Sequence, residues 1–160
     1  MRNQDTRETV QEIERVLAAH PFAVLATLSD RQPHTSLVAF TPVEGIRSLV
    51  FATYRSTRKF RGLRKNGRVA LFIGDREATT PRDASGRSLL TAHGLALEVT
   101  SDKRAALSAA HLRRHPDLAM LLSSPEAAMI QVEVTAYQLV GSIEDVRWLS
   151  LTATDEPHAH

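Results

Sequence analysis

The sequence contains no cysteine among its 160 residues, which excludes disulfide bonds, thiolate metal ligands and cysteine nucleophiles. Aromatic residues make up only 5% of the chain, too few for the stacking platforms of single-stranded nucleic-acid binders. No apolar run approaches the roughly 20 residues that span a bilayer, and the N-terminal segment lacks the apolar region of a signal peptide. We therefore expect no nucleic-acid partner, no membrane association and a cytoplasmic location.

Several catalytic motifs are also missing. Neither a Gly-x-Gly-x-x-Gly pattern nor a P-loop occurs, which argues against the common dinucleotide and nucleotide folds, and no Gly-x-Ser-x-Gly elbow provides a serine nucleophile. His111 and His115 have the i, i+4 spacing of a metal-binding pair on a helix. No third ligand accompanies them, and Arg113 and Arg114 would repel a cation. We therefore expect surface histidines here and no metal site.

Apolar residues are nevertheless plentiful. A hydrophobic content of 42% suffices for one domain with a core, which we place at residues 1–151, with a disordered tail at 152–160. Strand-like apolar stretches are predicted at residues 22–28, 33–40, 48–53, 68–74, 88–100, 128–134 and 137–149. Helices are predicted at residues 5–19, 58–66 and 102–114, with a further turn at 118–122.

The connections between these strands indicate how they pair. Consecutive strands separated by short turns favour antiparallel pairing, residues 41–47 are expected to form a turn, and Gly94 marks a bulge or bend. The polar loop 75–87 is expected to be the most mobile segment. The sequence thus predicts a mainly β fold with flanking helices, an antiparallel six- or seven-stranded barrel that is closed or partly open.

The turn between the third predicted strand and the second helix has features that suit a phosphate. Thr53, Ser56 and Thr57 offer hydroxyl groups, and Arg58 and Lys59 are adjacent cations at a helix N-terminus, where the dipole favours an anion. A solvated helix start is the simpler alternative. Two cations at the end of a helix where positive charge is unfavourable are, however, better explained by a bound anion. We therefore interpret this turn as a phosphate-binding site.

The same turn lies in a strongly basic stretch. Residues 45–74 contain eight Lys and Arg residues and no acid, although the net charge of the chain is only +2. Such a stretch could also contact nucleic acid. Aromatic residues among these cations are few, however, and no nucleic-acid-binding motif occurs. A phosphate group on a small molecule is therefore the ligand that we expect.

The run FAVLATLSDRQPHTSLVAF, followed by LVFATYRSTRKFRGLRKNGRVALFI, resembles the FMN-binding split barrels of the pyridoxamine 5'-phosphate oxidase type. In that family a strand ends in Thr, a Ser-Arg-Lys-like turn binds the FMN phosphate, and the next helix carries an Asn before an apolar strand. Thr53, the pair Arg58 and Lys59, and Asn66 match these positions. The resemblance covers about residues 10–100 well and the C-terminal part more loosely.

This resemblance implies a homodimer of split barrels with two FMN sites at the subunit interface. It implies that the flavin ring meets Thr35, Ser36, Leu37 and Val38, partly through backbone groups. The remaining FMN-binding positions that it implies are Ala52, Thr53, Ser56, Thr57, Arg58 and Lys59. We therefore expect an FMN-dependent oxidoreductase acting on a small-molecule redox substrate, with no side chain assigned as catalytic.

Other ligands are also compatible with a split barrel of this type. Related split barrels bind haem or the deazaflavin F420, and a non-enzymatic flavin carrier is a further alternative. The histidines that could supply a haem ligand are His34, His93, His111 and His115.

The true pyridoxamine 5'-phosphate oxidases carry an Arg and a Lys on the strand that matches residues 34–40, a Gln near Leu89 and a C-terminal Arg-x-His segment. None of these is present in this sequence, so we expect no oxidation of vitamin B6.

Overall fold

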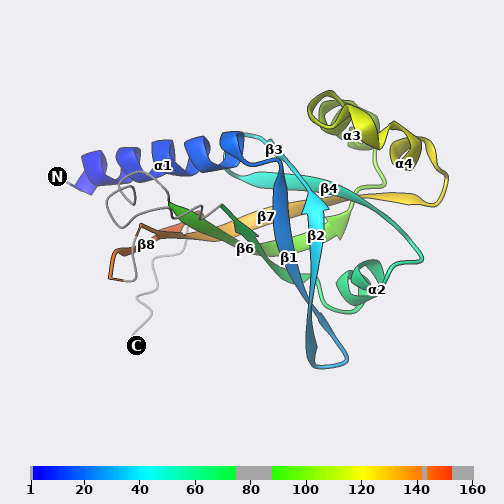
Figure 1. Cartoon of the computed structure of the whole chain (residues 1–160), viewed down its shortest axis with the longest axis horizontal. Helices are drawn as coiled ribbons and strands as arrows, with labels where there is room; N and C mark the ends of the chain where they lie inside the picture. Colours follow the sequence, from blue (N-terminus) through cyan, green and yellow to red (C-terminus); the bar gives the residue numbers. More distant parts are fainter. Residues whose placement is uncertain (1, 75–87, 142–143, 153–160) are drawn as a thin grey trace, which may run out of the picture.

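Eight antiparallel strands in one sheet form most of the molecule in the computed structural model, which describes residues 2–74, 88–141 and 144–152 (Figure 1). The main path of the sheet runs β2-β1-β5-β6-β7-β4-β3, and β8 pairs with β7. The strands are β1 (Phe22–Ser29), β2 (Gln32–Ala39), β3 (Thr41–Val43), β4 (Ser48–Tyr54), β5 (Arg68–Ile73), β6 (Leu89–Glu98), β7 (Ala127–Val140) and β8 (Val146–Ser150). The sheet curls into a half-open barrel, which confirms the predicted fold class.

The helices flank this barrel. They are α1 (Arg2–Ala19), α2 (Arg58–Lys65), α3 (Lys103–Arg114) and α4 (Ala119–Ser123), with the 3₁₀ helix η1 (Pro116–Leu118) between the last two. Helix α1 begins three residues before the predicted start, so Asp5 lies inside it, and its backbone carbonyl accepts a hydrogen bond from Thr9. Among the residues that the structure describes, no helix is both long and apolar enough to cross a membrane.

The core fills the inside of the curled sheet. Alternate residues of each strand point inward, such as Leu25 of β1 and Leu71 of β5, and both side chains are fully buried. Helix α1 contributes Ile13 and Leu17 to the same cluster because its apolar residues recur at helical spacing. Phe60 belongs to the same cluster and anchors α2 against the barrel. The position of α2, and so of the predicted phosphate turn, is therefore fixed by core packing.

Two sequence expectations about the strands were wrong in detail. Residues 41–47 were expected to form a turn, but Thr41–Val43 forms the short strand β3, which pairs with the start of β4. Residues 127–140 form one continuous strand in place of two. Residue 135 is bulged out of the pairing with β6 at His93 and Gly94, so β7 continues past the irregularity. The predicted mobile loop 75–87 and nearly all of the predicted tail lie outside the described residues.

The bulge itself confirms the expectation at Gly94. A Cβ atom at this position would lie 2.3 Å from the carbonyl oxygen of Glu133, which is closer than any side chain can approach. The hydroxyl of Thr135 donates to the carbonyl of His93 at 3.2 Å. Glycine therefore allows β6 and β7 to stay close where their register shifts.

The segment 103–123, which we call the α3–α4 arm, packs on the outside of the barrel. A second apolar cluster joins Val50 of β4 and Met129 of β7 to Leu107 and Leu122 of the arm. In Figure 1 the arm lies at the same end of the sheet as the end of β4 and the start of β7. It thus stands next to the turn that leads from β4 into α2.

Candidate functional site

The turn between β4 and α2 is held by a small network of hydroxyl groups. Thr57 is the N-cap of α2, because its Oγ1 accepts a hydrogen bond from the backbone N–H of Phe60 at 3.3 Å. The same hydroxyl donates to the carbonyl of Tyr54 at 2.9 Å and lies 2.9 Å from Oγ1 of Thr53. Thr57 therefore caps the start of α2, and its proton is already donated to Tyr54.

Four of the eight cations of the basic stretch have partners among the described residues. Arg55 forms an ion pair with Glu98 and donates to the carbonyls of Pro125 and Ala127. Arg61 donates to the carbonyl of Ser56 at 2.7 Å, and Lys65 pairs with Asp30 at 3.2 Å. The guanidinium of Arg64 lies 6.0 Å from the centre of the Phe60 ring. Because these cations are paired or packed on a ring, the stretch presents less free positive charge than its eight Lys and Arg residues suggest.

Arg58 and Lys59 differ from these cations. Within residues 2–74, 88–141 and 144–152, neither side chain has a hydrogen-bond or ion-pair partner. Arg58 is exposed and Lys59 is half-buried, and burial lowers the pKa of the Lys59 ammonium below its usual value. The first turn of α2 therefore carries two positive charges without a counter-charge.

A cavity of about 260 Å³ lies beside this turn. It is lined by residues from β1, β2, β4, the turn and the arm: Phe22, Leu37, Val38, Ala39, Ala52, Thr53, Tyr54, Thr57, Lys59, Leu118 and Leu121. We call this space the β2–β4 cavity. Its polar groups gather at the start of α2, and the apolar side chains of β2 and the arm form the remaining walls.

The β2–β4 cavity brings together six of the ten residues expected to bind the cofactor, namely Leu37, Val38, Ala52, Thr53, Thr57 and Lys59. The other four do not line it. Thr35 and Ser56 are exposed, Arg58 lies next to the lining residue Lys59, and Ser36 has a buried hydroxyl with no partner among the described residues. On β2 the cavity meets only the last three residues of the strand, Leu37, Val38 and Ala39, so Thr35 and Ser36 fall outside it.

Five lining residues were missed by sequence reasoning. Ala39 and Tyr54 directly follow expected positions and could have been included by extending those segments. Phe22, Leu118 and Leu121 come from β1 and from the arm. No motif marks them, because they reach the cavity only through the way in which the arm folds back toward β2 and β4.

The histidine pair of the arm is buried, and the expectation of surface histidines was wrong. His111 is 0% exposed and its Nδ1 lies 2.7 Å from Oγ1 of Thr41. Nε2 of His115 lies 2.8 Å from the carbonyl oxygen of Phe40, to which it donates. Burial, with the nearby His115 and Arg114, lowers the pKa of His111 to about 4. These histidines therefore attach the arm to the segment that follows β2.

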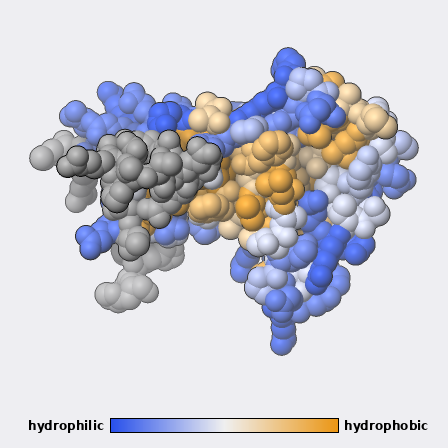
Figure 2. Space-filling view, viewed as in Figure 1, coloured by the Kyte–Doolittle hydropathy of each residue, from blue (hydrophilic) through white to orange (hydrophobic). Residues whose placement is uncertain are grey.

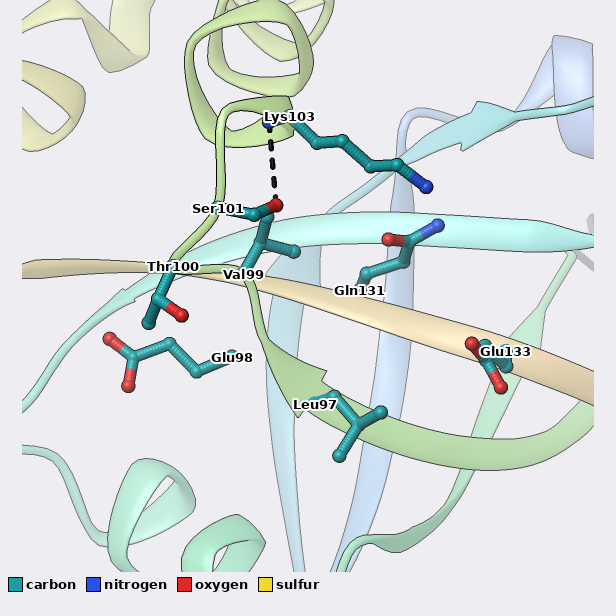
Figure 3. A pocket seen from close by; sticks show the side chains of 8 residues that line it. All are labelled: Leu97, Glu98, Val99, Thr100, Ser101, Lys103, Gln131 and Glu133. Carbon is teal, nitrogen blue, oxygen red and sulfur yellow. Dashed lines mark hydrogen bonds between the residues drawn. The ribbon is translucent and has the colours of Figure 1, made fainter.

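A second cavity, of about 310 Å³, lies between β6, β7 and the start of α3 (Figure 3). Its walls carry charges of both signs, including the exposed side chains of Lys103 and Glu133. Glu98 is paired with Arg55, and the amide of Gln131 donates to Ser48 at 3.1 Å. Because its polar groups are either exposed to water or already paired, we assign no chemistry to this cavity.

Comparisons with known proteins agree with this arrangement. A sequence profile of the family described as pyridoxamine 5'-phosphate oxidase matches residues 9–108, more than half of the chain. A pyridoxamine 5'-phosphate oxidase homologue of Schizosaccharomyces pombe is 30% identical over a match that covers 53% of this chain and 51% of the relative. The chain thus spans about half the length of the curated relative that it matches.

Solved structures with a similar fold include two proteins named for haem. The haem-binding protein of Mycobacterium smegmatis matches with a TM-score of 0.77 and 21% identity, covering 88% of this chain and 57% of that one. The haem storage protein of Vibrio cholerae matches with a TM-score of 0.65 and 18% identity, covering 78% of this chain and 88% of that one. At these identities the likeness concerns the fold alone.

Proposed function

The chain belongs to the pyridoxamine 5'-phosphate oxidase family, and from this membership we propose that it binds FMN and acts as a flavin-dependent oxidoreductase on a small molecule. The observation that carries the proposal is the β2–β4 cavity, where an unpaired ammonium and two hydroxyls adjoin apolar walls. FMN has the matching division into a charged phosphate and a planar, largely apolar ring. A pocket with a few polar groups and mainly apolar walls is typical of cofactor sites.

The phosphate end of the site is supported by charge. The half-buried ammonium of Lys59 and the neighbouring guanidinium of Arg58 have no counter-charge among the described residues, and an anion beside them would stabilise the charged form of Lys59. The N-terminus of α2 adds its dipole to this effect. With the proton of Thr57 on the carbonyl of Tyr54, Thr53 donates to Thr57, and a bound phosphate would take over this hydrogen bond from Thr53. We therefore assign the phosphate chiefly to Arg58, Lys59 and Thr53.

The ring end is supported by shape and polarity. Leu37, Val38 and Ala39 present one edge of β2 to the cavity, and Ala52 is small enough to leave space beside it. Bound FMN would supply hydride and single-electron chemistry, and the protein would supply binding, orientation and the exclusion of water. In this proposal no side chain acts as a catalytic acid or base.

The proposal includes a homodimer that covers the exposed apolar face of the sheet. Leu37, Val24 and Phe72 lie side by side on β2, β1 and β5, and they are 67%, 40% and 43% exposed. Figure 2 shows hydrophobic surface in the middle of this view, flanked by hydrophilic surface. A contiguous apolar face of this kind marks an interaction site in soluble proteins. Leu37 also lines the β2–β4 cavity, so a second subunit on this face would lie beside the FMN.

The absorption spectrum of the purified protein tests the proposal. Bound FMN gives a flavin band at roughly 450 nm, whereas haem gives a Soret band at roughly 410 nm. We expect the flavin band, and mass spectrometry of the released cofactor separates FMN from F420. A protein that takes up no flavin after incubation with FMN would refute the proposed function.

Haem binding is the second candidate because two proteins of similar fold are named for haem. The buried histidines do not favour it, since His111 and His115 are bonded to Thr41 and Phe40 inside the fold. Nε2 of both His93 and His111 has no partner among the described residues, but His111 is 0% exposed. His93 is therefore the better candidate for a ligand, since it is only half-buried and its ring stacks on Trp148. A Soret band that persists in a His93→Ala variant would exclude His93 as the ligand.

A further inference from the structure

We propose that the α3–α4 arm makes the β2–β4 cavity selective for an uncharged, apolar substrate, an inference that rests on the proposed FMN site. The arm contributes Leu118 and Leu121 to the cavity wall. Both are apolar, and among the described residues no polar side chain of the arm lines the cavity. A substrate beside the cofactor ring would therefore meet these leucines and not the cations.

The charges around the cavity support this selectivity. Of the described residues that line it, Lys59 alone is charged, and the proposed function assigns Lys59 to the FMN phosphate. No second cation lines the wall formed by the arm. An anionic substrate would therefore have to bury its charge against leucine side chains, which offer no hydrogen-bond donor to replace the lost hydration.

The exposed surface next to the cavity is also apolar. Phe22, at the start of β1, lines the cavity and is 51% exposed. Met120 of α4 lies between Leu118 and Leu121 in the sequence and is 85% exposed. Covering such side chains with an apolar ligand removes hydrocarbon surface from water, which favours binding. Phe22 thus extends the apolar wall of the cavity to the surface of the molecule.

The arm is anchored, so this wall exists before any ligand binds. Beyond the bonds of His111 and His115, Nη2 of Arg114 donates to the carbonyls of Leu17 and His20 at 2.7 and 2.8 Å, at the end of α1. The N–H of Leu118 donates to the carbonyl of His115 at 3.0 Å. A wall fixed in this way does not have to be ordered when the substrate arrives, which lowers the cost of binding.

Two quinones with the same bicyclic ring test the proposal. Menadione carries a methyl group where 1,4-naphthoquinone-2-sulfonate carries a negative charge. The affinity of each for the FMN-loaded protein is measured by equilibrium dialysis. We expect menadione to bind about tenfold more tightly or better, because the sulfonate would lose hydration at the leucine wall. Equal affinity, or tighter binding of the sulfonate, would overturn the proposal.

A pair of variants assigns the effect to the arm. Leu121→Asp places a charge in the wall and should weaken menadione binding by about tenfold or more. Leu112→Asp changes a leucine of α3 that is 36% exposed and does not line the cavity, so it should bind menadione as the unmodified protein does. Equal effects of the two substitutions would overturn the role of the arm. If Leu121→Asp fails to fold, the comparison of the two quinones on the unmodified protein still tests whether the cavity prefers an uncharged substrate.

The order of the measurements separates this inference from the proposed function. FMN loading is recorded before any quinone is added. A protein that does not load FMN refutes the proposed function, and the selectivity proposal falls with it. A protein that loads FMN but does not discriminate between the quinones refutes the selectivity proposal alone.

Discussion

Arg58 and Lys59 are adjacent in the sequence but lie in different surroundings. Arg58 points to solvent, where water screens its charge, whereas the ammonium of Lys59 is half-buried and its pKa is lowered by burial. The two residues are therefore not equivalent partners for an anion. A phosphate beside Lys59 would offset the cost of burying the charged ammonium and would also form a new contact.

Replacing both residues, as Arg58→Ala with Lys59→Ala, should release FMN from a folded protein. Charge-assisted hydrogen bonds to a phosphate contribute about 1.5–3 kcal/mol each, so the loss of two implies a Kd on the order of a hundredfold higher or more. Titration of the quenching of FMN fluorescence measures the change.

The control for this pair is Arg64→Ala with Lys65→Ala, which removes two charges from the last turn of the same helix. These side chains contact Phe60 and Asp30 and do not line the cavity. FMN affinity should change little in the control. Equal affinities of the two double variants would contradict the assignment of the phosphate to the start of α2.

Pyridoxamine 5'-phosphate requires a second set of cations, separate from those that hold the FMN phosphate. Among the described residues that line the β2–β4 cavity, Lys59 is the single charged group. We therefore expect no turnover of pyridoxamine 5'-phosphate or pyridoxine 5'-phosphate by the FMN-loaded protein. Formation of pyridoxal 5'-phosphate, followed by absorbance, with a kcat/KM near the usual enzyme range of about 10⁴ M⁻¹s⁻¹ would show that this expectation is wrong.

At the scale of elements, the arm and the strand β3 depend on each other. The bonds of His111 and His115 end on Thr41 and Phe40, at the junction of β2 and β3. The guanidinium of Arg114 lies 5.0 Å from the centre of the Phe40 ring and also reaches the end of α1. Three elements that are distant in the sequence thus meet at one buried junction.

The stability of this junction should depend on pH. His111 has a pKa of about 4 in the folded chain against an ordinary value of 6.5, so between these values the unfolded chain binds the proton more readily. The contribution of His111 to the free energy of unfolding is therefore fully present above pH 6.5 and is lost as the pH falls toward 4. The loss amounts to about 3 kcal/mol by linkage, and urea unfolding at several pH values measures it.

A His111→Gln variant should show a weaker pH dependence in this window, because glutamine does not titrate. His20→Gln serves as the control. The side chain of His20 lies at the end of α1, where its Nδ1 is 2.9 Å from the carbonyl of Val16, so the comparison of the two variants separates His111 from a histidine outside the arm. Identical pH profiles for His111→Gln and the unmodified protein would rule out this role of His111.

Patterns along the chain predicted most helices and strands, because these elements form from periodicities within short segments. The alternation in residues 22–28 and 33–40 reflects the two faces of a hairpin, and the hairpin has the expected strands. The strand β3 was missed because Pro42 and Gly45 are typical of a turn, and its pairing with β4 does not show in a short segment. His111 and His115 were placed on the surface because an i, i+4 pair looks the same on a buried and an exposed face.

At the scale of the whole molecule, the exposed apolar face predicts the assembly. We expect a dimer at micromolar concentration by light scattering. Phe72→Glu should give a monomer, because Phe72 is exposed on this face next to Val24 and a buried, unpaired carboxylate would be costly.

Val146→Glu is the matched control for Phe72→Glu, since Val146 is 42% exposed on the outlying strand β8. It should leave the dimer intact. A monomeric, FMN-bound form of the unmodified protein would contradict the proposed assembly.

The strand order also sets the sequence of events during folding. β4 ends at residue 54, and its long partner β7 begins at residue 127, so a chain emerging from the ribosome holds β4 with only the short β3 beside it until most of the chain has been made. Loop closure over such a distance is slow, and an unpaired strand edge is prone to aggregate while it waits. The barrel therefore closes late, and the cavity between β2 and β4 is completed only once β7 has reached its place.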